Sequence, residues 1–317
     1  MDLFSAVRLD PAVARLVAAI RESESARTHS GEGLWGSAAY ILAAHVWTQC
    51  NRPLLLVTAH GDEADDARDD FETAAAITPE LLPMLESFGS ESEADADLAA
   101  ARLALCLKLT DRTWGASASD RCAIASHRPE ADAPRSSAGG PVSDRPFFDS
   151  DPLVIVAPIQ SLMQPVPTAA AIAATSLNVR VGQRLDENKT MEWIESAGFT
   201  RCDQVEVPGD FSRRGGIIDL FSPGLSRPVR IELFGDDVES IRFFDANTQR
   251  SADAMQAVRI PAFSTAHVKF GIGKGGRQTD QTTSFLALLP RDTIIAFHEP
   301  IEIQELGRTY WQRLGER

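Results

Sequence analysis

A short glycine-rich stretch near the N-terminus comes close to the phosphate-binding loop of nucleotide-hydrolysing enzymes. Gly31 and Gly36 have the G-x-x-x-x-G spacing of that loop, within the sequence GEGLWGSA. In a working loop the next two residues are a lysine, which places a positive charge on the β- and γ-phosphates, and a serine or threonine, which holds magnesium. Here Ser37 and Ala38 stand in those positions and can do neither job. We interpret the stretch as a degenerate nucleotide loop that caps a helix, although helix amides there could still attract an anion.

No other group of residues has the spacing of a catalytic centre. The six histidines are scattered without the short intervals of metal ligands, and the nucleophile motif GxSxG does not occur. Acidic pairs such as Asp65-Asp66 are abundant, but on an acidic chain most of them are solvated surface. The glycine-rich residues 271–276 lack a preceding strand and a following hydroxyl, so we read them as a loop. The sequence therefore predicts no catalytic residue, no metal site and no cofactor for this segment.

The chemistry that the middle of the chain does offer is that of arginine. Arg213 and Arg214 are followed directly by Gly215 and Gly216, so the backbone can turn tightly there and present both guanidinium groups. A guanidinium grips a carboxylate in two places, and arginines ringed by apolar contacts are frequent hot spots of protein interfaces. This pattern indicates a protein-binding surface. The same segment supplies a further arginine and an aromatic residue, Arg201 and Phe211.

An alternative is that some of these arginines only pair with acidic neighbours on the surface of a sheet. Arg230 lies in the alternating run PVRIELFG and Arg213 precedes a strand, so both interpretations stay open for these two residues. We expect Gly215, Gly216 and Asp219 to be structural, shaping the hairpin.

Length, charge and cysteines narrow the class of protein. The chain has 317 residues, enough for about two domains, and a formal charge of −14. An acidic chain repels phosphates, so DNA contact is expected to be weak or absent. The four cysteines form no CxxC pair, which is typical of a reducing cytoplasm. The N-terminus shows no signal peptide, and no apolar run approaches the roughly 20 residues that span a bilayer, so no membrane contact is expected.

The apolar patterns predict an α/β layer at both ends of the chain. Residues 1–175 contain a helix after the glycine loop, the buried strand PLLLVTA, an acidic helix and the strand DPLVIVA, which together indicate an α/β domain. Within it, residues 115–150 are rich in Ser, Ala, Pro, Gly and Asp and are predicted to be a disordered insertion. Residues 263–317 return to the α/β pattern, with SFLALLP read as helical, RDTIIAF as a strand and a final amphipathic helix. The pattern stops as though a longer protein had been cut.

Between these ends, residues 176–262 have a different texture. A strand-like run and the capped helix DENKTMEWIESAGF come first. Four predicted strands follow, DQVEV, GGIIDLF, PVRIELFG and VESIRFFD, separated by Pro, Gly and Asp turns. This order predicts a small α+β domain with an antiparallel sheet, inserted into the α/β layer.

Long ordered runs in this insert resemble a known family. PGDF, RRGGIIDLFSPG, PVRIELFGDDVESIR and FDANTQRS together resemble bacterial transcription-repair coupling factors and, less closely, the excinuclease protein UvrB. VIVAPIQSLMQPVP, GLWGSA and RDTIIAFHEPIEIQELGRTYWQRL extend the resemblance over nearly the whole chain except residues 115–150.

The resemblance implies a UvrB-like module of DNA repair. Its α/β part is similar to a helicase lobe without working ATPase motifs, and its insert binds the excinuclease protein UvrA, recruiting it to stalled RNA polymerase in nucleotide excision repair. Motor domains that bind ATP, magnesium and DNA, and a domain that interacts with RNA polymerase, are expected beyond Arg317. This segment is then expected to be no enzyme by itself. The partner-contacting arginine of the family falls at Arg214, and its second arginine is expected at Thr200, where Arg201 follows one place later.

Two other functions compete with this reading. One is a nucleotide-binding helicase or ATPase lobe with DNA contact, against which the residues after Gly36 count. The other is a DNA-contacting damage sensor like UvrB, which uses an aromatic-rich hairpin, whereas this chain has only two tyrosines, Tyr40 and Tyr310.

Overall fold

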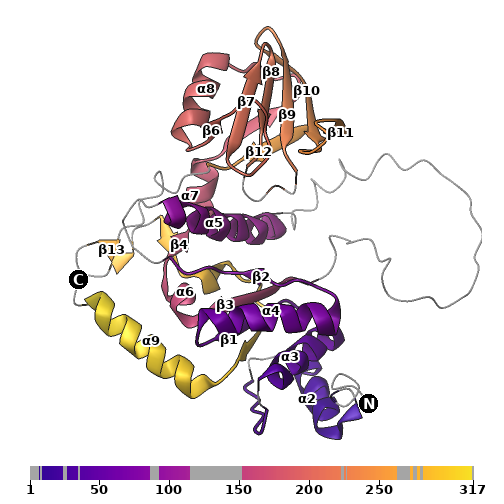
Figure 1. Ribbon diagram of the computed structural model, residues 1–317, viewed down its shortest axis with the longest axis vertical. Helices are drawn as coiled ribbons and strands as arrows, with labels where there is room; N and C mark the ends of the chain where they lie inside the picture. The colour runs from indigo at the N-terminus through magenta and orange to yellow at the C-terminus, as the bar shows by residue number, and fades with distance from the viewer. Residues whose placement is uncertain are drawn as a thin grey trace, which may run out of the picture. The chain divides into compact units, whose positions relative to one another are not determined.

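The computed structural model describes residues 7, 9–23, 27–34, 36–85, 93–114, 152–222, 225, 227–262, 272–273, 277–278 and 281–315. These residues form two compact units, each assembled from separated stretches of the chain. Figure 1 labels their helices and strands. One unit is drawn from Met1–Glu80, Asp111–Val156 and Pro290–His298. The other is drawn from Leu81–Thr110, Ala157–Leu289 and Glu299–Arg317. The predicted insertion at 115–150 lies outside the described residues. Among the described residues, no helix has both the length and the apolar character needed to cross a membrane.

The first unit is an α/β layer. Its sheet has the strand order β16-β1-β3-β2, formed by Ile294–Phe297, Leu54–Thr58, Val154–Pro158 and Glu80–Leu81. β1 and β16 run parallel, and every residue of β1 and β3 is buried, as is usual for strands covered on both faces. The helices of this unit are α2 (Pro11–Arg21), α3 (Ser37–Cys50) and α4 (Gly61–Ala75). The α/β class predicted for this part of the chain is confirmed.

The second unit combines helices with a separate antiparallel sheet. Besides the segment that carries this sheet, the unit contains two longer helices and several short elements. The longer helices are α5 (Glu93–Trp114, which runs past the unit's boundary) and α9 (Pro300–Gly315). The short elements are α6 (Ile159–Met163), β4 (Val166–Pro167), α7 (Ala169–Ala174), β13 (Ile272–Gly273), β14 (Arg277–Gln278), β15 (Thr282–Thr283) and the 3₁₀ helix η2 (Phe285–Leu288). The run SFLALLP was expected to be helical and forms the 3₁₀ turn η2.

A buried arginine ties the helical part of this unit together. The Arg102 side chain is 3% exposed, and its guanidinium donates to the carbonyls of Pro83 at 2.6 Å, Ser161 at 3.3 Å and Gln164 at 3.2 Å. Ser161 and Gln164 lie in and just after α6, whose C-terminal carbonyls attract a cation. Burial lowers the pKa of Arg102 to about 10, so the side chain stays charged at neutral pH.

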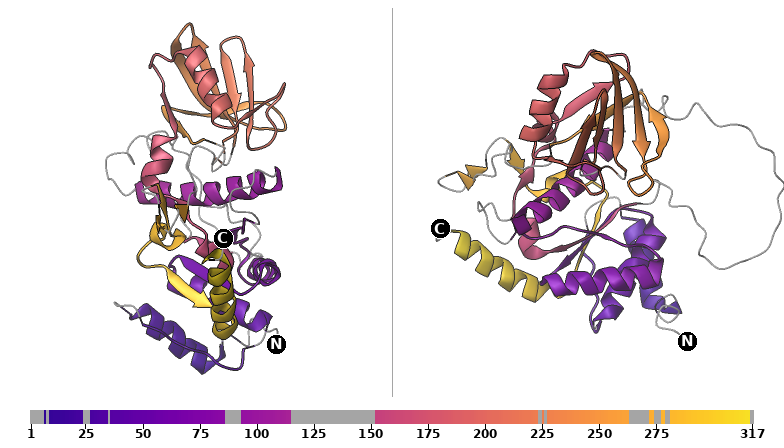
Figure 2. Two further views of the ribbon diagram at one scale, coloured as in Figure 1. Left: turned by 90° about the vertical axis from the view of Figure 1, so that its left-hand side faces the viewer. Right: turned by 45° about the horizontal axis from the view of Figure 1, so that its top comes forward.

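The antiparallel sheet occupies residues 200–255. Its order is β11-β10-β9-β8-β7-β6, with only β6 and β7 parallel. The strands are β6 (Thr200–Arg201), β7 (Asp210–Arg214), β8 (Ile217–Leu220), β9 (Val229–Phe234), β10 (Asp237–Phe244) and β11 (Ser251–Met255). The helix α8 (Glu187–Ser196) lies against one face of this sheet (Figure 2). A two-stranded ladder of β5 (Leu177–Arg180) and β12 (Ala257–Ile260) brings the first and last strands of the segment together.

One core fills the space between the sheet, α8 and the β5–β12 ladder. It is built from apolar residues that alternate along the strands, together with Ile194 of α8. The strand residues of this core include Val179, Phe211, Ile218, Leu220, Val229, Ile231, Val238, Ile241, Val258 and Ile260. The small α+β arrangement with an antiparallel sheet is therefore confirmed, whereas the exact domain limits at 175/176 and 262/263 stay predictions.

One predicted strand is wrong. DQVEV, residues 203–207, forms no strand, because side chains and not a neighbouring strand bind its backbone. The Asp210 carboxylate accepts from the amides of Glu206 and Val207, both at 3.0 Å, and the Gln249 side chain donates to the carbonyl of Val205 at 3.0 Å. Side-chain hydrogen bonds of this kind compete with sheet pairing.

We expect Arg102→Ala to destabilise the protein by roughly 3 kcal/mol, because three buried carbonyls would lose their donor and each unsatisfied group costs about 1–3 kcal/mol. Lys108→Ala, at an exposed position of the same helix, should change stability far less. Native-state hydrogen exchange of the α5 and α6 amides measures both. Equal protection in the two variants would contradict the central role of Arg102.

Candidate protein-docking surface

The predicted arginines lie at the end of a tight hairpin. Arg214 pairs with Ile217, so Gly215 and Gly216 form a two-residue turn between β7 and β8. Gly215 has a φ of +59°, the first-position conformation that type II′ turns reserve for glycine. Gly216 lies against β9: the amide of Leu233 donates to its carbonyl at 2.7 Å, and an added Cβ would stand 2.6 Å from the Leu233 oxygen. Both glycines therefore lie in the turn, the first with a positive φ and the second where a side chain would meet β9.

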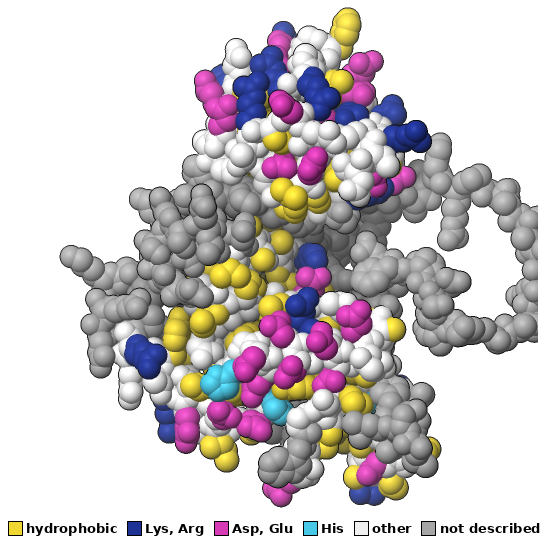
Figure 3. All heavy atoms as spheres, in the orientation of Figure 1, with side chains coloured by type: hydrophobic (Ala, Val, Ile, Leu, Met, Phe, Trp, Pro, Cys, Tyr) yellow, Lys and Arg dark blue, Asp and Glu magenta, His cyan; other side chains and the backbone are white. Residues whose placement is uncertain are grey.

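The pairing register decides which side chains share a face of the sheet. Side chains of paired residues in a sheet point to the same side, and successive residues point to opposite sides. Arg214 pairs with Ile217, and Ile217 pairs with Glu232, so these three point to the same side. We call this side the outer face, because the core residues occupy the opposite one. In Figure 3, dark-blue basic side chains gather in the upper part of the view, where Figure 1 shows β7 to β10.

Arg213 and Arg201 fall on the other side. Arg213 pairs with the core residue Ile218 and reaches the start of α8, where its Nη2 lies 2.5 Å from Oε1 of Glu187. Arg201 pairs with the core residue Phe211, whereas Thr200 pairs with Asp210. The one-place offset seen in the sequence therefore moves the second arginine to the opposite side of the edge strand β6.

Phe211 needs a correction. It was predicted to contact the partner, but its side chain is only 1% exposed and belongs to the core between the sheet and α8. Its role is to support β7. The strand alternation D-F-S-R-R could have shown this, because Phe211 and Arg214 are three residues apart and so point to opposite sides.

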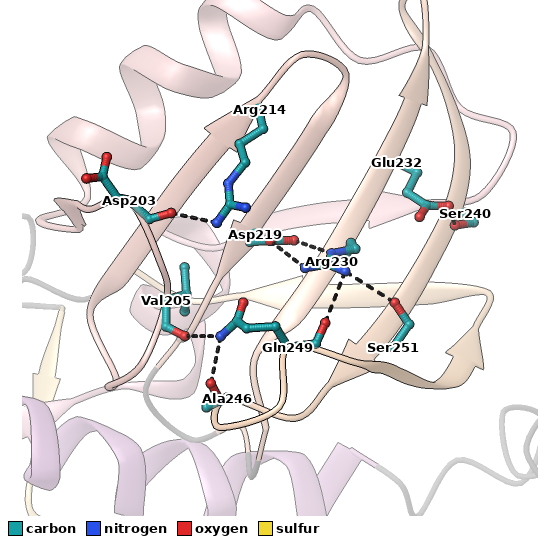
Figure 4. Close-up of polar contacts among 10 residues, drawn as sticks. All are labelled: Asp203, Val205, Arg214, Asp219, Arg230, Glu232, Ser240, Ala246, Gln249 and Ser251. Atoms are coloured by element: carbon teal, nitrogen blue, oxygen red, sulfur yellow. Dashed lines mark hydrogen bonds and ion pairs between the residues drawn. The ribbon is translucent and has the colours of Figure 1, made fainter.

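Arg214 is exposed and has a fixed direction. Its Nη2 donates to the backbone carbonyl of Asp203 at 2.6 Å (Figure 4). Within the described part of the chain, no carboxylate forms an ion pair with this guanidinium. Arg214 therefore presents N–H donors to solvent while one of them holds the side chain along the sheet.

The neighbouring strands are joined by a buried ion pair. Asp219 of β8 and Arg230 of β9 are paired residues, and two hydrogen bonds of 2.7 Å and 2.8 Å connect them. Only 5% of the Asp219 side chain and 18% of the Arg230 side chain are exposed. Hydrogen bonds to Asp219 raise the pKa of Arg230, whose guanidinium also lies 4.8 Å from the ring centre of Phe244. Arg230 is thus a sheet residue with an acidic partner, and Asp219 acts in mid-strand rather than at the turn.

An exposed aromatic residue that the sequence analysis did not single out completes the outer face. Phe234 is 78% exposed and follows Glu232 by two residues, so it points to the same side as Arg214. It borders a second two-residue turn, Gly235-Asp236, whose backbone is held by Leu185 and whose carboxylate pairs with Arg184 at 2.9 Å. The strand alternation in R-I-E-L-F was the signal that could have placed Phe234 beside the arginine.

The degenerate loop lies in the first unit, at the start of α3. Gly36 is the N-cap residue, and Ser37 and Ala38 are the first two residues of the helix. Residues 27–34, which contain Gly31, are irregular, so the described residues before the helix do not include the strand that leads into a phosphate-binding loop.

Comparisons with known proteins agree with this geometry. Residues 177–265 match the family described as the UvrB interaction domain, so the segment with the antiparallel sheet is similar to an interaction domain of that kind.

Whole proteins that are similar to this chain include transcription-repair coupling factors. The chain is 27% identical to the factor of Bacillus subtilis over 72% of its own length and 16% of the relative's. It is 33% identical to the Escherichia coli factor over 34% of the chain, and 38% identical to the Myxococcus xanthus factor over 33%, in each case 9% of the relative. The chain therefore spans a small fraction of these proteins, and the resemblance noted from its sequence motifs is confirmed. The chain is therefore similar to part of a group of proteins named as factors that couple transcription and repair.

We expect Asp219→Ala to destabilise the sheet by about 3 kcal/mol, because it leaves Arg230 charged and unpaired in a largely buried place. Asp253→Ala is the matched control, since it removes an ion pair of similar length, 2.6 Å to Arg227, at an exposed position, and it should have little effect. Hydrogen exchange of the β8 and β9 amides reports the difference. Similar losses of amide protection in both variants would contradict a stabilising role of the buried Asp219–Arg230 pair.

Proposed function

We propose that this chain is a docking module that recruits UvrA to stalled RNA polymerase in transcription-coupled nucleotide excision repair. It acts in the cytoplasm as the front part of a coupling factor whose other domains supply the ATP- and magnesium-dependent motor and the contact with RNA polymerase. The module itself catalyses no reaction and binds no nucleotide or metal. Its contact with DNA is weak or absent.

The observation that carries this proposal is the exposed Arg214. Its direction is fixed by the Asp203 carbonyl, and no described carboxylate neutralises it, so a partner's carboxylate can bind it with little ordering cost. The family match of the surrounding domain supports UvrA as that partner.

The apolar part of the surface is Phe234 with Ile217, which is 37% exposed. Strand spacing puts Arg214 and Phe234 about 12 Å apart on the outer face, well inside one protein footprint. Arginine and aromatic residues are both enriched in protein interfaces. The UvrA surface that fits has a carboxylate and an adjoining apolar pocket.

Reversing one charge on each face of the sheet distinguishes binding at the outer face from a general effect of net charge. Arg214→Glu should weaken UvrA binding by about 2 kcal/mol or more, roughly 30-fold, because a hot-spot cation is replaced by an anion. Arg201→Glu has the same net charge on the opposite side of the sheet and should change the affinity little. Calorimetric titration of purified UvrA into the full chain measures both. No binding by the unsubstituted chain, or equal losses in the two variants, would overturn the proposal.

Removing the aromatic anchor tests the apolar part. Phe234→Ala should weaken UvrA binding roughly 10-fold while leaving the melting temperature unchanged, because most of this side chain is exposed to solvent in its own domain. Leu286→Ala is the control, since that side chain is also exposed, at 46%, but lies outside the interaction domain. An unchanged affinity of Phe234→Ala would remove Phe234 from the surface.

A further inference from the structure

Arg214 owes its direction to a loop that is not part of the sheet. The carbonyl that accepts from Arg214 belongs to Asp203, in the stretch 202–209 between β6 and β7. The ends of this stretch bond to neighbouring backbone, Cys202 to Phe211 and Gly209 to Thr200 and Phe221. Its middle, residues 203–207, has no strand partner, so side chains that bind its backbone help to hold it. Two do so from outside: Asp210, at the start of the strand that carries Arg214, and Gln249.

Gln249 lies far from this loop in the sequence, in the turn after β10. Its side-chain amide donates both N–H groups, one to the carbonyl of Val205 at 3.0 Å and one to that of Ala246 at 2.6 Å. One half-buried side chain thus joins the turn after β10 to the loop before β7 (Figure 4). A carboxylate of the same shape could not make either bond, because it has no hydrogen to donate.

The backbone of Gln249 has an unfavourable conformation. Its φ is +58°, in the left-handed region, where a residue with a side chain costs about 1 kcal/mol or more relative to the ordinary helical region. Its amide donates to the Asp245 carbonyl at 2.7 Å, and its carbonyl is 3.5 Å from Nη1 of Arg230. Strain of this kind persists where the surrounding contacts enforce it, and it is common at sites with a function.

We propose that Gln249 is a positioning residue for partner docking. It holds the stretch 202–209 at Val205, and thereby the Asp203 carbonyl that orients Arg214. The inference rests on the proposed function, because it assumes that Arg214 is the docking cation. Gln249 itself would not contact the partner. It would act on Arg214 through its two side-chain hydrogen bonds and the stretch 202–209.

A double-mutant cycle on the full chain tests this role. Gln249→Glu keeps the shape but removes both donors, and it should weaken UvrA binding roughly 10-fold. In that background, Arg214→Ala should cost only about 3-fold instead of about 30-fold, because an arginine that is no longer aimed contributes less. Gln256→Glu, at an exposed glutamine of the same domain, is the control for the added charge. It should leave both the affinity for UvrA and the roughly 30-fold cost of Arg214→Ala unchanged.

The outcomes separate the two proposals. If Arg214→Ala costs the same in both backgrounds, Gln249 has only a structural role and the inference is overturned, while the docking function stands. If the unsubstituted chain does not bind UvrA, or Arg214→Ala has no effect on binding, the proposed function fails first. Should Gln249→Glu not fold, Gln249→Gly replaces it, since glycine relieves the backbone strain while still removing the amide, and the same smaller cost of Arg214→Ala is expected in that background.

Discussion

The register between β7 and β8 is the constraint on which the docking surface depends. Arg214 pairs with Ile217 and Arg213 with Ile218, and because side chains alternate, neighbouring arginines in the sequence are sent to opposite faces. One then faces solvent beside Ile217 and Phe234, and the other reaches Glu187 at the start of α8. A slip of one residue would exchange their roles and bring Ile217 into the core in place of Ile218. The buried core thus selects which of the two arginines lies on the outer face.

On this sheet, the role of a charged side chain depends on how deeply it is buried and not on how many charges lie nearby. Asp219 and Arg230 form a largely buried pair with two hydrogen bonds, which fixes the strands, while Arg214 forms no ion pair with a carboxylate of the described residues. The middle of the loop before β7 is held by the side chains of Asp210 and Gln249 instead of by sheet pairing. A rigid sheet and a tethered loop together let a single exposed cation keep one direction, which lowers the ordering cost of association.

Much of this architecture could be predicted from the sequence. The buried runs LLLVT and VIVAP, the capped helix after Asp186 and the Gly215-Gly216 turn each combine a pattern with a physical requirement, so the α/β layer and the antiparallel sheet followed from them. The strand assigned to 203–207 failed because its hydrogen-bond partners come from Asp210 and Gln249, which no local pattern announces. Phe211 and Arg201 were grouped with Arg214 by composition, whereas the face of each depends on register. Register is set by long-range pairing, which a propensity argument does not contain.

The central proposal is that UvrA binds the outer face of this sheet and not the face that carries α8. A photoreactive amino acid placed at Ile217, between Arg214 and Phe234, reports that contact directly, and one placed at Glu192, exposed on α8, reports the opposite face. We predict a covalent adduct with UvrA from position 217 and little from position 192. A strong adduct from 192 with none from 217 would contradict it.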